Sequence, residues 1–372
     1  MRFTVSTQVL QRGLSTISGS IGTNSVLPIL DDFLFRLEGN TLKVLASDLQ
    51  TSMLVDIPVV ATEGGIVAVP ARILLDTLKA LPDQPLEFEV DNESYLVNIV
   101  SETGSYSLAG ENAEDFPEIP TDTASDRIAL DATTLAEALG RSLFAVSSDE
   151  LRLAMTGINV EIDEGGMRLI ATDAHKLVKY TNKQAKITGY ANFIVPKKSG
   201  TLLKNALANA VGDLEMSWND THAFFSVEGL QMVCALIDGK FPDVTPIIPT
   251  NNPNELTINR VDFQSALKRI SIFASKTTYQ VLMDIKMSSV QLFAEDLDYS
   301  NKAAEHVVCQ YHGNDMQIAF NARFLIELLG NIDTEQVRMQ LSTPSRAGLV
   351  LPGEETEGEE LFMLVMPIMM NR

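Results

Sequence analysis

Residues 43–48 read KVLASD, and closely similar stretches return as RLIATD at residues 168–173 and QLFAED at residues 291–296. Each stretch is a short apolar run, as expected of a buried strand, that ends in Ala-x-Asp. The final aspartates lie 125 and 123 positions apart by subtraction: Asp48, Asp173 and Asp296. Recurrence at a fixed period is typical of a chain built from repeated units, so this motif predicts three copies of one unit.

A second motif follows the same period and combines a short apolar strand with a helix. Its copies are VAVPARILLDTLKAL (residues 67–81), FIVPKKSGTLLKNAL (193–207) and IAFNARFLIELLGNI (318–332). The matching position holds Pro70, Pro196 or Asn321. Proline suits the first turn of a helix and asparagine suits its N-cap, so each copy predicts a helix start.

A third motif opens each unit and has the pattern of an amphipathic helix. Its copies are TQVLQRGLSTISGSI (residues 7–21), TTLAEALGRSLFAV (133–146) and VDFQSALKRISIFA (261–274). Apolar residues four positions apart, such as Leu10 and Leu14, place one apolar face along such a helix. Three motifs that recur in one order predict a triplication of about 125 residues.

The segments between these helices predict sheets. Runs such as FLFRLEGNTLKVLA (residues 33–46) and AFFSVEGLQMVCALI (223–237) are apolar or alternating, and turn pairs such as Gly39-Asn40 and Gly165-Gly166 break similar runs into hairpins. The expected fold class is therefore α+β, with three tandem copies of a domain in which two helices pack on antiparallel sheets.

Two linkers suggest where the copies meet. Residues 111–126 (ENAEDFPEIPTDTASD) and 238–254 (DGKFPDVTPIIPTNNPN) are rich in Pro, Asp, Asn and Thr. We expect boundaries near 120 and 250, which gives domains at residues 1–120, 121–250 and 251–372.

Composition narrows the class of protein. With 45% hydrophobic and 21% charged residues, the chain reads as an ordinary folded protein, and neither a signal peptide nor a long apolar run is evident. We expect a cytoplasmic protein without a membrane segment. Cys234 and Cys309 lie in apolar runs and are expected to be reduced core thiols. The four histidines lack zinc-site spacing, so no metal or cofactor is expected.

Charge is distributed unevenly along the chain. The net charge of −21 alone argues against DNA, which is itself a polyanion. The predicted helical segments nevertheless hold few acidic residues beside a larger basic set. That set is Arg12, Arg72, Lys79, Arg141, Lys197, Lys198, Lys204, Lys268, Arg269, Lys276 and Arg323. Such segregation favours a helical surface that faces phosphates without reading sequence, although helices are often basic for solubility alone.

Several motifs together make the chain similar to the bacterial DNA polymerase III beta subunits, the sliding clamps, over its whole length. The matching segments are VLPIL (residues 26–30), SDL (47–49), VPAR with a helix and LP (69–82), DFP (115–117), ATDAHKL (171–177), IVPKK (194–198), IDGKFPD (237–243) and VMP (365–367).

This resemblance implies a non-enzymatic processivity factor. A head-to-tail homodimer would form a closed ring lined by helices, which encircles double-stranded DNA and slides along it. The implied protein partners are the DNA polymerase III catalytic subunit, the clamp loader, and other polymerases and repair proteins that bind through linear motifs.

The resemblance also implies two kinds of contact site. A hydrophobic pocket between the second and third domains would bind partner peptides, and adaptable Met side chains suit that role. The matching positions are Met155, Thr172, Ala174, His175, Lys176, Leu177, Pro242, Ile247, Pro344, Arg346, Leu364, Val365, Met366 and Pro367. At the subunit boundary we expect strand pairing and the apolar residues Tyr106, Leu108, Ile272 and Phe273 rather than salt bridges.

Two positions depart from the family pattern. Many members carry a basic residue where this chain has Asn24, and the residues after Ile368 are Met369, Met370, Asn371 and Arg372 rather than a short apolar-Arg ending. We therefore expect no basic DNA contact at residue 24 and a pocket lip that differs from the family pattern.

Two other readings of the sequence remain. An enzyme could use the three Ala-x-Asp aspartates, but a catalytic acid rarely recurs at equivalent positions of one fold, and a turn role is favoured. No nucleophile or phosphate-binding motif accompanies His175, and the acidic run at residues 352–360 favours a solvated loop over a divalent-ion site. A repeat scaffold that binds only protein is the second alternative.

Overall fold

The computed structural model describes residues 1–22, 27–124, 126–184, 190–208, 210 and 212–369. Asn24, Met370, Asn371 and Arg372 lie outside these residues. The chain forms two compact units: unit 1 contains residues 1–137 and 198–236, and unit 2 contains residues 138–197 and 237–372. This division cuts through the middle repeat, whose two halves join different units. The boundaries near 120 and 250 follow the repeats instead and remain a prediction.

The described helices follow the repeat. They are α1 (Thr7–Ile17), α2 (Ala71–Ala80), α3 (Ala132–Ser142), α4 (Lys197–Leu207), α5 (Arg260–Ile270) and α6 (Ala322–Gly330). All six coincide with the segments that the second and third motifs predict. A turn of 3-10 helix follows each first helix, namely η1 (Ser18–Ser20), η4 (Leu143–Ala145) and η7 (Ser271–Phe273).

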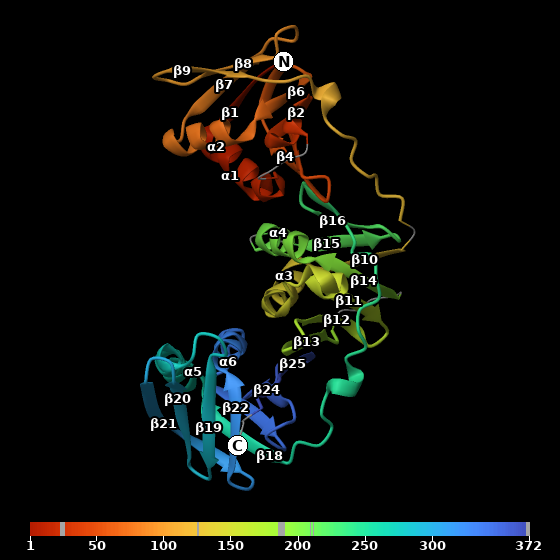
Figure 1. The fold of residues 1–372 in the computed structure, drawn as a ribbon. Coiled ribbons are helices and arrows are strands. Elements are labelled where there is room, and N and C mark those ends of the chain that lie inside the picture. The colour runs from red at the N-terminus through yellow and green to blue at the C-terminus, as the bar shows by residue number, and fades with distance from the viewer. Residues whose placement is uncertain (23–26, 125, 185–189, 209, 211, 370–372) are drawn as a thin grey trace. The chain divides into compact units, whose positions relative to one another are not determined.

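Local chemistry explains where these helices start and which face they bury. Asn321 caps α6, because its side chain accepts a hydrogen bond from the backbone N–H of Arg323 at 2.9 Å. Pro70 stands at the N-cap of α2 rather than in its first turn, one position earlier than expected. Leu10 and Leu14 of α1 are fully buried, which confirms the apolar face. Figure 1 shows α1 and α2 packed side by side.

Unit 1 holds two antiparallel sheets. The first has the order β5-β1-β7-β8-β9, and the second has the order β10-β15-β16-β17-β4-β3-β2-β6. Their strands are β1 (Arg2–Ser6), β2 (Asp32–Glu38), β3 (Thr41–Ser47), β4 (Thr51–Pro58), β5 (Val60–Glu63), β6 (Gly65–Pro70), β7 (Pro85–Val90), β8 (Leu96–Val100), β9 (Ser105–Ala109), β10 (Asp126–Asp131), β15 (Asp213–Trp218), β16 (His222–Val227) and β17 (Leu230–Ala235).

Unit 2 holds one long sheet of order β14-β11-β12-β13-β25-β24-β23-β18-β21-β20-β19-β22. Its strands are β11 (Gly157–Asp163), β12 (Gly166–Thr172), β13 (Lys176–Asn182), β14 (Ala191–Pro196), β18 (Asn254–Asn259), β19 (Gln280–Lys286), β20 (Ser289–Asp296), β21 (Asn301–His312), β22 (Met316–Asn321), β23 (Gln336–Leu341), β24 (Gly348–Pro352) and β25 (Glu359–Val365).

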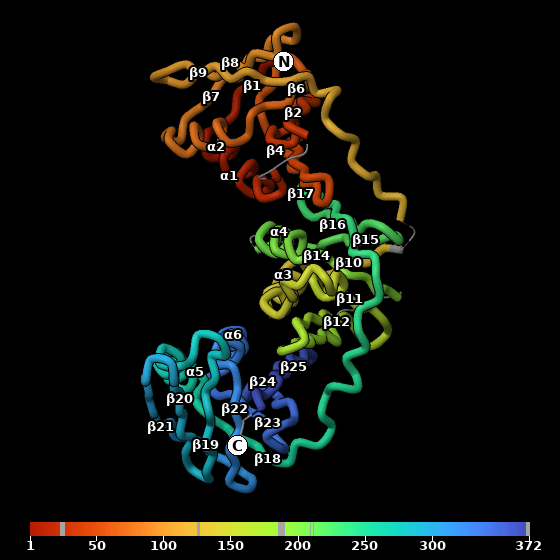
Figure 2. Tube along the Cα trace, in the orientation of Figure 1, coloured from red at the N-terminus to blue at the C-terminus, as the bar shows by residue number. Residues whose placement is uncertain are grey.

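The same strand junction occurs once in each unit. In unit 1, β17 from the middle repeat pairs with β4 from the first, and Val233 lies opposite Ser52 (Figure 2). In unit 2, β25 from the third repeat pairs with β13 from the middle one, and Leu364 lies opposite Leu177. Because 52 and 177 differ by the repeat length, the repeats join through equivalent strands.

The Ala-x-Asp aspartates shape turns, as predicted. Asp48 Oδ1 accepts the backbone N–H groups of Gln50 and Thr51, and Asp173 Oδ1 accepts those of His175 and Lys176. An aspartate that bonds the backbone two or three residues on stabilises a tight turn. Asp296 repeats this with Asp298 N–H at 3.2 Å.

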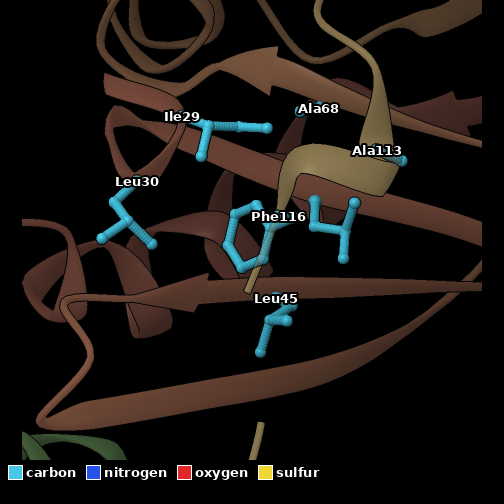
Figure 3. Close-up of a cluster of buried hydrophobic side chains, with 7 residues drawn as sticks. Ile29, Leu30, Leu45, Ala68, Ala113 and Phe116 are labelled. Atoms are coloured by element: carbon cyan, nitrogen blue, oxygen red, sulfur yellow. The ribbon is translucent and has the colours of Figure 1, made fainter. Parts of the chain in front are cut away.

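The linkers are irregular but packed. Ala113 and Phe116 from the first linker lie against Leu45 and Ala68, together with Ile29, Leu30 and Leu34 (Figure 3). Short 3-10 turns, η3 (Ala113–Asp115) and η6 (Thr245–Ile247), interrupt the two linkers. The linkers therefore add buried apolar contacts to the sheets that they cross.

The two cysteines are part of the core, as expected. Cys234 and Cys309 are free and buried, and burial raises the pKa of the Cys234 thiol to about 12, so both behave as core thiols.

The turn between β11 and β12 is Glu164-Gly165 rather than Gly165-Gly166, because Gly166 already pairs with Asp163. Gly166 has φ +110°, which is why glycine stands there.

Candidate functional site

A cavity of about 540 Å³ opens on unit 2. It lies between the turn that joins β12 to β13, the end of β25, and two loop segments, residues 246–251 and 345–347. The lining residues are Thr172, Ala174, Lys176, Leu177, Pro246, Ile247, Ile248, Pro249, Thr250, Asn251, Ser345, Arg346, Ala347, Leu364 and Met366. Its wall is mainly apolar with two basic side chains, which suits an apolar peptide segment.

The β12–β13 turn forms one wall of this cavity. Thr172 Oγ1 accepts the Ala174 N–H at 3.1 Å and donates to the Lys176 carbonyl at 2.8 Å. Ala174 adopts a left-handed backbone with φ +72°, which the turn holds in place. The Met366 N–H donates to the His175 carbonyl at 2.8 Å, so the turn and the end of β25 are joined across the mouth.

Lys176 is a buried cation at the base of this turn. Its side chain is only 6% exposed, and its Nζ lies 2.6 Å from Asp173 Oδ2 and 3.1 Å from Glu327 Oε2. The ammonium also stands 4.8 Å from the Phe324 ring centroid, and the His175 ring stacks on Phe324 at 5.7 Å. Two carboxylates and an aromatic face stabilise the buried charge, so α6 braces the turn.

An apolar cluster forms the floor of the cavity. Its buried residues are Ile170, Leu177, Val244, Ala347, Leu349 and Leu364, with Phe241, Ile248 and Phe362 packed against them. This floor is continuous with the sheet core, so a ligand side chain in the cavity would contact rigid apolar surface.

Eight of the fourteen predicted pocket residues line this cavity, and six do not. Thr172, Ala174, Lys176, Leu177, Ile247, Arg346, Leu364 and Met366 are among the lining residues. Pro242 and Pro344 are exposed and lie close in sequence to lining residues. The His175 ring stacks on Phe324. Met155 and Pro367 are half-buried but do not line the cavity. Val365 is fully buried and is not among the lining residues.

The sequence reading missed most of the linker's contribution. Pro246, Ile248, Pro249, Thr250 and Asn251 form a continuous part of the wall. The composition of the run PIIPTNN (residues 246–252) predicts only a linker. Two adjacent isoleucines between two prolines at residues 246–249 have little polarity for an exposed loop, and that signal could have placed the segment on an apolar surface.

The predicted DNA-facing side chains are mostly exposed, but several already have partners. Arg12, Arg72, Lys197, Lys268, Lys276 and Arg323 are exposed. Arg141 pairs with Asp333 at 3.0 Å and is mostly buried, and Lys79 lies 3.7 Å from Asp76. Lys198 pairs with Asp48, and Arg269 with Glu305. The Arg323 guanidinium stacks 3.5 Å from the Tyr279 ring. These pairings lower the positive charge that is available to a phosphate.

The predicted subunit-contact residues divide between the two units. Tyr106 and Leu108 lie on β9, the last strand of its sheet, where Leu108 is buried and Tyr106 half-buried. Ile272 and Phe273 lie on η7 and are 66% and 40% exposed. Ile272 and Phe273 are adjacent, so together they offer exposed apolar surface to another molecule.

The described residues show neither a membrane-spanning helix nor a candidate metal cluster. None of the helices there is long and apolar enough to cross a membrane. Within the same residues, no group of three or more His, Cys, Asp or Glu side chains could hold a metal ion.

Comparison with known proteins gives a consistent family. Residues 1–120, 129–243 and 245–368 match the sequence models of the N-terminal, central and C-terminal domains of the DNA polymerase III beta subunit. Two curated relatives are the "Beta sliding clamp" of Pseudomonas aeruginosa, 26% identical over 99% of this chain and 100% of the relative, and that of Staphylococcus epidermidis, 25% identical over 99% of each.

Solved structures agree in fold. A Pseudomonas aeruginosa sliding clamp, the DNA polymerase III subunit beta, bound to griselimycin has a TM-score of 0.94 at 25% identity, with full coverage of both chains. A Bacillus subtilis DNA polymerase sliding clamp has a TM-score of 0.93 at 23% identity, also with full coverage, and shows likeness of fold alone.

Proposed function

The chain belongs to the DNA polymerase III beta subunit family, the sliding clamps, and is thus a processivity clamp for a DNA polymerase; from this premise we propose how it holds DNA and its partners. It encircles double-stranded DNA as a head-to-tail homodimer and performs no chemistry itself. Partners bind through linear motifs in the unit 2 cavity. The observation that carries the proposal is the threefold repeat, because three similar copies per chain can form a closed ring from two chains.

The proposed dimer uses two sheet edges. Among the described strands, β9 pairs only with β8, and residues 301–308 of β21 pair only with β20, because β18 covers residues 309–312. By the repeat, β21 corresponds to β4 and β13, and β9 corresponds to β17 and β25. We therefore propose that β9 of one protomer pairs with β21 of the other, which gives these two strand edges a partner.

Apolar contacts beside this pairing would complete the interface. Tyr106 and Leu108 of one protomer would meet Ile272 and Phe273 of the other. Residues 101–110 contain no basic side chain, so the contact is expected to depend on apolar burial more than on ion pairs.

Duplex DNA would be held by enclosure and by weak phosphate contacts. The basic helical residues, from Arg12 to Arg323, offer sequence-independent contacts, while the net charge of −21 repels DNA from the remaining surface. Because several of these cations already pair with carboxylates, each phosphate contact is weak and exchangeable. Weak contacts permit sliding where tight ones would stall it.

The unit 2 cavity is proposed to bind the polymerase III catalytic subunit, the clamp loader, and other polymerases and repair proteins in the cytoplasm. Its apolar floor and the exposed Met366 favour apolar anchor residues. The exposed Arg346 at the wall favours a peptide with an acidic or carbonyl-rich partner group, whereas the Lys176 ammonium is already paired with Asp173 and Glu327.

The test of enclosure compares two forms of one DNA. The purified protein is loaded with the cognate loader and ATP on nicked circular DNA, and part of the sample is linearised. At moderate salt, the protein is expected to stay on the circles and to leave the linear form by sliding off the ends. Equal retention on the circular and linear forms would indicate a scaffold that binds the DNA surface or other proteins without encircling DNA. That result would contradict the clamp.

The test of the pocket is Met366→Asp. A carboxylate placed on the apolar wall is expected to weaken binding of the polymerase catalytic subunit at least tenfold, because the charge must be desolvated by an apolar anchor. Surface plasmon resonance measures the affinity, and native mass spectrometry should report an intact dimer. Unchanged affinity for the polymerase would remove the pocket assignment while leaving the ring untouched.

A further inference from the structure

Unit 1 carries a second cavity, of about 410 Å³, that the proposed function does not use. It lies between the linker residues 119–122 and strands β4, β15, β16 and β17. Leu54, Ile119, Phe224 and Val233 supply apolar wall, and Ser226 and Gln231 supply polar groups at the side. Figure 3 shows the neighbouring cluster of the same linker, in which Phe116 anchors the chain before it crosses the sheet.

This cavity has the same construction as the unit 2 cavity. Ser52 stands at the repeat position of Leu177, and each lies opposite a lining residue of the added strand, Val233 in one case and Leu364 in the other. In both units the linker that follows a Phe-Pro pair crosses the junction and closes one side. The second cavity is therefore a built feature of the repeat rather than an accidental surface hollow.

The two cavities differ in charge. The charged lining residues of the unit 2 cavity are the exposed Arg346 and Lys176, whose buried ammonium is paired with Asp173 and Glu327, whereas those of the unit 1 cavity are Asp122 and Glu215. Arg127 lies 3.2 Å from Asp122 and 2.7 Å from Glu215, so one cation faces two carboxylates. Glu215 is 53% exposed and retains room for a second cation. The wall is complementary to a ligand that combines apolar groups with one positive charge.

We propose that the unit 1 cavity is a second peptide-binding groove, which takes an extended segment with apolar anchors and one Arg or Lys side chain directed to Glu215. Four adjacent strands at about 4.8 Å spacing span about 14 Å, which is the length of four to five extended residues. The apolar anchors would contact Leu54, Ile119 and Val233. Ser226 and Gln231 would hydrogen-bond the peptide backbone.

This proposal rests on the proposed function in one respect: peptide binding at the unit 2 cavity is the precedent for peptide binding at the unit 1 cavity. It adds a partner class of opposite charge. Partners with acidic motifs and partners with basic motifs could then occupy one protomer together, without competition for a single site.

The experiment uses the full-length protein and two fluorescent hexapeptides. The first contains two leucines, one phenylalanine, one arginine and two serines, and the second is identical except that glutamate replaces arginine. Fluorescence anisotropy should show saturable binding of the arginine peptide. Val233→Trp, which fills the groove, and Glu215→Lys, which reverses its charge, are each expected to weaken that binding about tenfold or more.

Matched variants separate this groove from other effects. Glu87→Lys makes the same charge change at an exposed position of β7 in unit 1, and Met366→Asp blocks the other cavity; both should leave the arginine peptide's affinity unchanged. Absence of saturable binding to the unmodified protein, unchanged binding in Val233→Trp and Glu215→Lys, or loss in Met366→Asp alone would each overturn the proposal. Failure of the unit 2 assignment would instead appear as polymerase binding that Met366→Asp does not alter.

Discussion

Asp32 is a buried carboxyl whose pKa departs strongly from its ordinary value. It begins β2, is only 6% exposed, and its Oδ2 has no hydrogen-bond partner among the described residues. Burial raises the pKa of this carboxyl to about 7, and the nearby charges of Glu111 and Asp31 add to the effect. The folded state therefore prefers the protonated acid, whereas the unfolded chain ionises near its ordinary pKa of 3.8.

The sign of the stability effect follows from these two pKa values. Below about pH 4 both states are protonated and Asp32 costs little. As the pH rises to about 7, the unfolded state alone loses its proton, so stability falls. Asp32→Asn is expected to raise the free energy of unfolding by roughly 2–4 kcal/mol at pH 8 and by much less at pH 5.

Urea denaturation at the two pH values measures this difference. Asp76→Asn, an exposed carboxylate on α2, is the control and should change neither curve appreciably. A gain of the same size at pH 5 and pH 8 would mean that the substitution acts through packing rather than ionisation.

At the residue scale, the sequence predicted the structural role of single residues better than the partners that they contact. The turn role of Asp48 and Asp173 followed from their repetition alone. The pairing of Lys198 with Asp48, or of Arg141 with Asp333, could not be predicted, because each joins residues far apart in the sequence. For the same reason Val365 could not be separated from Leu364: both are apolar, and only the packing around β25 decides which one faces the cavity.

At the scale of elements, side-chain contacts hold α6 and the β12–β13 turn together. Phe324 of α6 stacks on His175 and lies under the Lys176 ammonium, and Glu327, one helical turn further along, pairs with the same ammonium. The turn forms the pocket wall, so the helix is expected to control how well that wall is ordered before a peptide binds.

Phe324→Ala tests this coupling. Loss of the ring removes the stack and the cation–π contact, worth about 1 kcal/mol, and should weaken polymerase-subunit binding about three- to tenfold, mainly through a faster off-rate. Surface plasmon resonance gives both rates. Ile326→Ala, at a half-buried residue of the same helix, is the control and should leave both rates unchanged. Equal loss in both variants would indicate general weakening of α6.

Helices were the elements that the sequence predicted best. Period, helix-start residues and apolar faces all agree with local backbone chemistry, and all six segments are helical. The pairing partners of the strands were harder to predict from the sequence, because the pairs β4–β17 and β13–β25 join different repeats. Linker packing was missed for a related reason: residues 246–251 gain their apolar contacts only from strands supplied by two repeats.

At the scale of the whole molecule, the repeat explains why β9 and residues 301–308 of β21 each pair with only one neighbour among the described strands. Two of the three equivalent junctions form within the chain, and the strands of the third, β9 and β21, belong to the two ends of the repeat series. A strand edge without a partner invites association, and here both edges are available for one specific contact. The proposed dimer is therefore the completion of a pattern that the chain has already repeated twice.

Phe273→Asp tests that completion. Phe273 is 40% exposed on η7, and an aspartate there would place an unpaired charge in the apolar part of the proposed interface. The dimer is expected to dissociate at least a hundredfold more readily in native mass spectrometry, and retention on nicked circular DNA should be lost with it. Peptide binding at the unit 2 cavity should persist, because each protomer carries that cavity complete. Met287→Asp, which introduces the same charge at a residue 78% exposed on the turn between β19 and β20, should stay dimeric. If Phe273→Asp remains as tight a dimer as the unmodified protein, the ring must close through another surface.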